Sequence, residues 1–161
     1  MHHVTFLRDE PGQENLQTHD QSGVSVPDSA LILGVVANGQ PRAYLASGMA
    51  EPEWHLAHDT LGSKQVTVTY CDWNQCARAF ERGTNAPAAI RMGGVKSGVM
   101  QIKLNEKNYD QTNPQIPLLD LTVVQMTWGE WKTLHPTTDI YLGNKEEKFA
   151  LEGKSLPNGG R

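Results

Sequence analysis

Apolar and polar side chains alternate in several short stretches of this chain, and the alternation predicts β-strands. The clearest stretch is KQVTVTYC at residues 64–71, in which valine and tyrosine take one set of positions and threonine takes the other. Successive side chains of a strand point to opposite faces of its sheet, so a two-residue period is typical of this element. We expect a strand here.

A second stretch, residues 30–46, predicts a β-hairpin. Two apolar runs flank Asn38-Gly39, a dipeptide that tolerates the positive φ angles of a two-residue hairpin turn. The second run carries Arg42 and Tyr44. These two side chains either line a pocket or pack across neighbouring strands, and the sequence leaves both interpretations open.

Other apolar stretches predict the remaining strands. Residues 75–82, which include the second cysteine, form either a strand or a short helix. Strands are also expected in three later stretches, at residues 88–104, 118–126 and 138–143. Gly93-Gly94 indicates a bend within a strand rather than a cradle for phosphate.

One helix is predicted at residues 127–135. Thr127 is placed as its N-cap and Glu130 stands three positions on, which is the pattern of a capping box. Pro136 would end the helix because proline removes a backbone donor. Trp128 and Trp131 are three residues apart, a spacing that anchors one helix face to a sheet.

The segment at residues 51–60 is the second predicted helix, ending near Gly62. These elements together predict a mainly β fold of the α+β class. We expect a single compact domain, mostly antiparallel sheet with two short helices, at residues 27–151. Residues 1–26 are predicted to form a polar N-terminal arm, and residues 152–161 a flexible C-terminal tail.

Charge and composition exclude several classes of protein. The formal net charge is −4 and Lys and Arg do not cluster, so we expect no nucleic-acid partner. No apolar run is long enough to cross a bilayer, so we expect no transmembrane segment. Motifs for phosphate, dinucleotide or covalent haem binding are absent from the sequence, as is the elbow of serine hydrolases.

Both cysteines, Cys71 and Cys76, lie in one short stretch with four residues between them. A loop of this length can fold back far enough for a disulfide. Free structural thiols, metal ligation and reversible redox chemistry are the alternatives, and the spacing does not decide among them. A thioredoxin-like reaction is disfavoured because the motif differs and no βαβ pattern follows.

Two histidines give the best candidate for a metal site. On a helix, His55 and His58 would share one face and could bind one ion. With Cys71 or Cys76 they would form a mixed nitrogen and sulfur site suited to copper or zinc. The alternative is that His55 is a buried structural residue beside Trp54.

Asp59 follows these histidines and has two interpretations. Its carboxylate either accepts a hydrogen bond from an imidazole and orients it, or caps the turn that ends at Gly62. His135, directly before a proline, is expected to interact with carbonyl groups at the end of the helix.

Four short motifs in this order resemble a bacterial domain-of-unknown-function family (number 3179). They are NGQPRAY at 38–44, WHLAHD at 54–59, a strand ending TYC at 69–71 and WGEWKTLHP at 128–136. The match spans residues 31–142. The resemblance implies a mostly β fold and export from the cytoplasm, and it supplies no established reaction.

This chain departs from the family pattern at its cysteines. The family has a C-x-x-C pair, whereas Cys71 and Cys76 are separated by four residues. Export, which the resemblance implies, would favour a disulfide between them. The expected localisation is therefore extracytoplasmic, in the periplasm after removal of a signal. A cytoplasmic location is the alternative, because the first twelve residues do not resemble a signal peptide.

The sequence offers no complete set of nucleophile, base and acid. We therefore expect a non-enzymatic binding or accessory domain that contacts a protein partner or small ligand, as a subunit of a larger assembly. The alternative function is a copper- or zinc-binding protein or a thiol redox protein that uses Cys71, Cys76 and His55. We also expect His55 to lie close to the loop between the cysteines, covered by Trp54 or Trp73.

Overall fold

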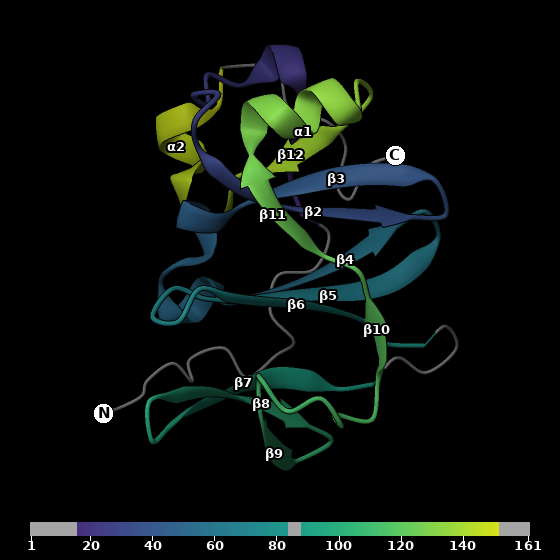
Figure 1. Cartoon of the computed structure of the whole chain (residues 1–161), viewed down its shortest axis with the longest axis vertical. Coiled ribbons are helices and arrows are strands. Elements are labelled where there is room, and N and C mark those ends of the chain that lie inside the picture. The colour runs from purple at the N-terminus through teal and green to yellow at the C-terminus, as the bar shows by residue number, and fades with distance from the viewer. Residues whose placement is uncertain (1–15, 84–87, 152–161) are drawn as a thin grey trace.

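Three β-sheets lie one above another, and helices cover the outer face of the uppermost sheet (Figure 1). This arrangement comes from a computed structural model that describes residues 16–83 and 88–151. Within them are twelve strands and two short α-helices. The prediction of a mainly β fold of the α+β class is confirmed.

The upper sheet has five strands in the order β1-β12-β3-β2-β11. Strands β12 and β3 are parallel, and the other neighbouring pairs are antiparallel. The strands span Thr18–Asp20 (β1), Leu31–Ala37 (β2), Gln40–Leu45 (β3), Val124–Thr127 (β11) and Asp139–Tyr141 (β12).

The predicted hairpin is the pair β2 and β3. Asn38 and Gly39 connect the two strands with φ angles of 50° and 79°. Two successive positive φ angles define the turn that matches the twist of paired strands, which is why this dipeptide ends the first apolar run. The strand expected at residues 138–143 is also present, as β12.

The middle sheet has four strands in the order β10-β6-β5-β4, all antiparallel. Its strands span Leu56–Leu61 (β4), Lys64–Cys71 (β5), Cys76–Glu81 (β6) and Leu119–Leu121 (β10). The alternation in β5 is confirmed, although both of its faces are buried, including Thr67 and Thr69. The threonine face is covered because a third sheet packs against it.

That third sheet is formed by β7 (Ile90–Lys96), β8 (Val99–Leu104) and β9 (Lys107–Asp110) in sequence order. A register shift between Met92 and Gly94 places a bulge at the predicted bend. One apolar cluster fills the space between the upper and middle sheets, and another lies between the middle and third sheets.

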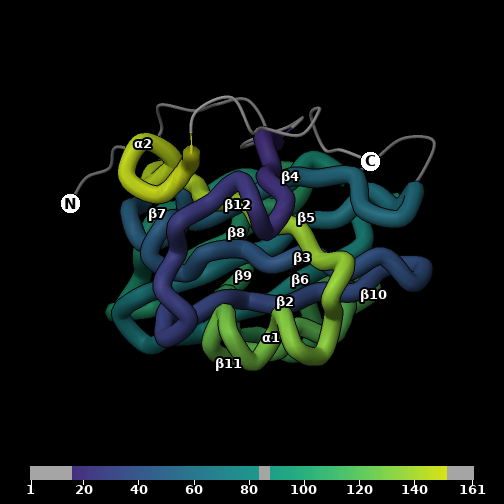
Figure 2. Tube along the Cα trace, turned by 90° about the horizontal axis from the view of Figure 1, so that it is seen from above, coloured from purple at the N-terminus to yellow at the C-terminus, as the bar shows by residue number. Residues whose placement is uncertain are grey.

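Helix α1, Trp128–Leu134, covers the upper sheet beside β11, as seen from above in Figure 2. The predicted capping box is present: Thr127 Oγ1 accepts from the Glu130 amide, and the Glu130 carboxylate accepts from the Thr127 amide. Both tryptophans are buried, as the anchor interpretation predicted. A Cβ at Gly34 of β2 would overlap the Trp131 ring, so glycine is needed for this close approach.

The helix predicted at residues 51–60 is wrong. The chain makes short 3₁₀ turns at Ala46–Met49 and Pro52–Trp54 and then enters strand β4. Gly62, taken as a helix end, instead forms a hairpin turn with Ser63, with φ angles of 57° and 70°. Pairing with β5 decides the structure here, because strand formation depends on neighbouring strands more than on local preference. The second helix is instead α2, Glu146–Phe149.

The stretch 118–126, expected to be one strand, is two. Strand β10 belongs to the middle sheet and β11 to the upper sheet, so residues 122 and 123 carry the chain from one layer to the next. A single apolar run in the sequence does not reveal that its two halves pair with different partners.

The predicted polar arm at residues 1–26 differs from the structure over its second half. Residues 1–15 lie outside the described residues, as do 84–87 and the tail at 152–161. Leu16 and Thr18, however, are buried, and β1 pairs with β12. In the part of the chain that is described, no helix is long and apolar enough to span a membrane.

Candidate functional site

Four polar residues, Arg42, Tyr44, Asp59 and Asp139, meet between the upper and middle sheets. Arg42 of β3 binds both carboxylate oxygens of Asp139 on the neighbouring strand, at 2.9 and 3.0 Å. From the facing sheet, Asp59 Oδ2 accepts from Arg42 Nη1 at 2.7 Å and from the Tyr44 hydroxyl at 2.6 Å. The four side chains therefore tie two sheets together.

This cluster is closed to solvent. The side chains of Arg42 and Asp59 are fully buried, and that of Asp139 is 3% exposed. Burial alone lowers the pKa of Arg42, but its hydrogen bonds and the charges of Asp139 and Asp59 raise that pKa overall. Burial and the charge of Asp59 raise the pKa of Tyr44. Arg42 and Tyr44 thus lie in a buried contact between the sheets, and Asp59 binds these two side chains and, through Oδ1, the Thr60 amide.

His58 is a structural residue between the middle and third sheets. Its Nδ1 lies 2.6 Å from Thr67 Oγ1 and its Nε2 lies 3.0 Å from the Ile90 carbonyl oxygen. Burial, reinforced by the charge of Arg82, lowers the pKa of His58 to about 3. His58 lies in strand β4, whereas His55 precedes the strand and its ring contacts the Met49 carbonyl, so the two imidazoles have separate partners.

His55 lies at the start of β4, beside the end of β5. Its carbonyl oxygen accepts from the Tyr70 amide at 2.9 Å, and its Nδ1 lies 2.8 Å from the Met49 carbonyl oxygen. Its Nε2 is 3.9 Å from Asp72 Oδ1, in the loop between the cysteines. Burial lowers the pKa of His55. The expected nearness of His55 to this loop is therefore found at Asp72.

Cys71 and Cys76 stand directly opposite each other where β5 and β6 meet their turn. Both are free thiols, Cys71 buried and Cys76 half-buried. The Cys76 amide donates to Asn74 Oδ1 in the turn at 3.2 Å. Residues directly opposite in an antiparallel pair have Cα atoms about 4.5–5.5 Å apart, within the range of a disulfide. The disulfide stays a prediction.

Trp73 is at the tip of this turn and is 72% exposed. Of the two tryptophans predicted to cover His55, Trp73 is therefore mostly in solvent and Trp54 is half-buried. Trp73, which follows the exposed carboxylate Asp72, is the most accessible aromatic residue in the described part of the chain. Its exposure could have been predicted from the sequence, because turn residues lie at the surface.

A pocket of about 280 Å³ opens beside this turn. Tyr70 and Asp72 form one wall. The other walls are small or apolar residues that were not predicted from the sequence, Ala30, Leu31, Ala46, Ser47 and Ala50. We call this pocket, together with His55 and Trp73, the hairpin-end site.

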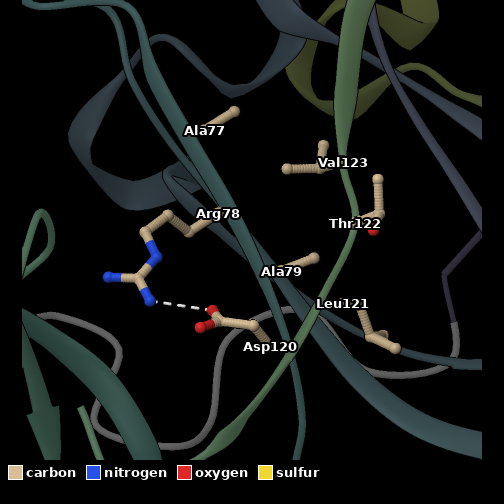
Figure 3. Close-up of a pocket in the computed structure, with 7 residues that line it drawn as sticks. All are labelled: Ala77, Arg78, Ala79, Asp120, Leu121, Thr122 and Val123. Atoms are coloured by element: carbon tan, nitrogen blue, oxygen red, sulfur yellow. Dashed lines mark hydrogen bonds and ion pairs between the residues drawn. The ribbon is translucent and has the colours of Figure 1, made fainter. Parts of the chain in front are cut away.

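A second pocket, of about 240 Å³, lies where β10 leaves β6 (Figure 3). Its charged groups are already paired: Arg78 binds Asp120 at 2.8 Å and donates to the carbonyl oxygens of Gln111 and Asn113. The Arg78 guanidinium also lies over the Phe80 ring. This pocket is an opening at the sheet edge whose only charges satisfy each other and nearby carbonyls.

Metal ligands do not converge in residues 16–83 and 88–151, where no group of three or more His, Cys, Asp and Glu side chains could hold an ion. Of the residues predicted from sequence, the structure brings His55 to the cysteine loop and places His58, Asp59, Arg42 and Tyr44 in buried structural contacts.

Comparisons with known proteins add no assignment. No family model matches the chain, and neither a curated protein nor a solved structure matches it. The resemblance to the domain-of-unknown-function family therefore stays a prediction.

Proposed function

We propose that this chain is a non-enzymatic binding domain, an accessory subunit of a larger assembly, and that it recognises its partner through the hairpin-end site. The observation that supports this most is a tryptophan, Trp73, which is 72% exposed and follows Asp72, a residue that lines a pocket of about 280 Å³. Binding energy in protein interfaces is concentrated in a few residues, among which tryptophan is enriched.

The protonation states at the site favour binding over catalysis. Burial raises the pKa of Cys76, so its thiol stays protonated and is a weak nucleophile. Burial raises the pKa of Tyr70, and the charges of Asp72 and Cys71 raise it further. Burial lowers the pKa of His55, which keeps the imidazole neutral. Each shift favours the uncharged form, whereas a reactive centre needs a charged nucleophile or a poised base.

The proposal includes an extracytoplasmic location, which rests on the resemblance described above. A periplasmic location is compatible with an accessory subunit, since the site is on the surface and accessible to a partner protein in that compartment.

Thiol redox chemistry is a second candidate, supported by the register of Cys71 and Cys76. A disulfide would form when the two thiols pass two electrons and two protons to an oxidised partner disulfide. Mass spectrometry of intact protein, purified without reductant, decides between the states. A loss of two hydrogen masses together with protection of both residues from iodoacetamide supports the bridge, and full labelling of both residues contradicts it.

The binding proposal is tested by a fragment screen with amide NMR. A chemically mixed set of cationic, anionic, aromatic and aliphatic fragments is added to the full chain. We expect the largest shifts at Ala46, Ser47 and Tyr70. The amides of the second pocket, at Ala79 and Thr122, serve as the internal control. The proposal fails if no fragment shifts the hairpin-end amides, or if the second pocket is favoured.

A further inference from the structure

We propose that the hairpin-end site binds an arginine side chain presented by a partner protein. This inference rests on the proposed function and specifies the chemistry that the site recognises. Two groups of different character, the Asp72 carboxylate and the Tyr70 phenol, line one small pocket. The exposed indole of Trp73 follows Asp72 in the turn. An arginine guanidinium suits all three, because it pairs with a carboxylate, donates to an oxygen and stacks on an aromatic ring.

The size of the pocket suits one long side chain. Its volume is about 280 Å³. Sites for drug-sized ligands and cofactors occupy about 300–1,000 Å³, so this pocket is at the small end of that range. The walls opposite Tyr70 are mainly alanine and serine, which leave a narrow space with little polar character. Such a space accepts the apolar stem of one long side chain and leaves the remainder of the partner outside.

Asp72 supplies a charge for a cation. In the part of the chain that the structure describes, its one ion-pair partner is His55, and the two groups are 3.9 Å apart, beyond hydrogen-bond distance. Because burial lowers the pKa of His55, that ring is neutral near pH 7 and leaves the carboxylate uncompensated. Glu51 and Glu53 are exposed nearby and act electrostatically on the same ring. The local field therefore attracts positive charge.

Tyr70 supplies a hydroxyl group that can form a hydrogen bond with a ligand in the pocket. The residue is 4% exposed and lines the pocket. Its hydroxyl makes no hydrogen bond to the residues that the structure describes. A phenol oxygen accepts hydrogen bonds, and a guanidinium carries five N–H donors in a fixed plane. One arginine head can therefore donate to Tyr70 and to Asp72 together, which the single ammonium of lysine does less well.

Trp73 supplies the aromatic surface beside the carboxylate. Its 72% exposure leaves the ring face open to a partner. Arginine is the cation found most often over tryptophan, because its flat guanidinium combines cation–π attraction with stacking. The neighbouring Asp72 strengthens that contact by charge. A partner segment with an arginine flanked by small residues fits this surface.

The test uses blocked tripeptides added to the full-length chain and followed by amide NMR. The central residue is arginine, citrulline or lysine, and glycine flanks it. Citrulline has the shape of arginine without the charge, so it isolates the electrostatic part. We expect the arginine peptide to shift the amides of Ser47 and Tyr70, and to bind about tenfold more tightly than the citrulline peptide. Lysine should be intermediate.

Two variants locate the contacts. Asp72→Asn and Trp73→Ala should each weaken arginine binding about two- to fivefold, as expected for a surface ion pair and a cation–π contact. Matched controls are Asp120→Asn and Leu119→Ala, which change an exposed carboxylate and an exposed apolar side chain elsewhere. They should leave binding unchanged. Melting curves of all four variants confirm that folding is preserved.

The outcomes separate this inference from the proposed function. If neutral or anionic fragments bind the hairpin-end site but arginine and citrulline peptides bind it equally, the arginine assignment is overturned and the binding domain stands. If the arginine peptide shifts the control pocket, or no amide of the hairpin-end site at millimolar peptide, the assignment is also overturned. Selective loss with Asp72→Asn and Trp73→Ala supports it.

Discussion

Replacing Arg42 by methionine should destabilise the fold more than any surface substitution. Arg42→Met keeps an apolar stem of similar length but removes the positive charge between Asp59 and Asp139. Both carboxylates stay in a layer where their side chains are 0% and 3% exposed. Removing one member of a buried ion pair usually costs about 3–5 kcal/mol, because the remaining charge is uncompensated.

The contacts in the structure also predict how strongly two other substitutions destabilise the fold relative to Arg42→Met. Asp59→Asn leaves the paired contact of Arg42 with Asp139 intact, and it weakens the hydrogen bonds from Arg42 and Tyr44. The expected loss is smaller, about 1–3 kcal/mol. Lys64→Met removes a partly exposed pair with Glu81 and should cost about 1 kcal/mol or less.

Urea unfolding at pH 7 measures these differences through the midpoint, provided that the slope with denaturant is unchanged. A domain of this kind has a total stability of about 5–15 kcal/mol, so the Arg42→Met midpoint should fall by a large fraction. If Arg42→Met costs no more than Lys64→Met, the two sheets are not held together by this cluster and the reasoning is wrong.

Other parts of the fold give shorter predictions. His58 has a pKa of about 3 when folded and about 6.5 when unfolded, so the unfolded chain takes up a proton first as the pH falls. The contribution of His58 to the free energy of unfolding is therefore fully present above pH 6.5 and decreases by about 1.4 kcal/mol per pH unit between pH 6.5 and 3. Urea unfolding of His58→Gln should lack this pH dependence. Gly34→Ala should lower the melting temperature, with a cost of about 1–3 kcal/mol, because its methyl group would overlap the Trp131 ring; an unchanged melting temperature would show that the helix does not pack as described. Reduced Cys76 should react with iodoacetamide more slowly than free cysteine at pH 8, because burial raises its pKa; equal rates would contradict the burial of this thiol.

The alternation of side chains was sufficient to predict individual strands, because it depends only on which residues lie on each face. It identified β5 from valine and threonine positions and the β2–β3 hairpin from Asn38-Gly39. It did not reveal that the threonine face of β5 is buried as well. That depends on a third sheet whose residues are distant in sequence.

The 51–60 segment shows where local signals are ambiguous. A glycine after an apolar run is typical of a helix end and equally of a hairpin turn, and Gly62 belongs to the second class. The choice follows from pairing between β4 and β5. Predicting a helix here also joined His55 and His58 in one metal site, although in the structure the two imidazoles have separate partners.

The candidate site was only partly accessible from the sequence. The nearness of His55 to the cysteine loop was predicted, because a short connection joins the two segments. The pocket itself was not, since Ala30, Ala46 and Tyr70 come from three separate segments that meet only in the folded chain. Asp59, 17 residues away, is likewise brought to Arg42 by packing of two sheets, and Asp139, 97 residues away, by pairing of β12 with β3.

The most direct test of binding at the hairpin-end site is fluorine NMR of the chain with fluorotryptophan in place of tryptophan. The four tryptophans give four signals, and single substitutions to phenylalanine assign them. Trp128 and Trp131 are buried residues of helix α1 and act as internal controls, whereas Trp73 is exposed at the site. Addition of the arginine tripeptide and of the mixed fragments should shift the Trp73 signal and leave those of Trp128 and Trp131 in place. An unmoved Trp73 signal, when other parts of the chain do respond, would contradict the account.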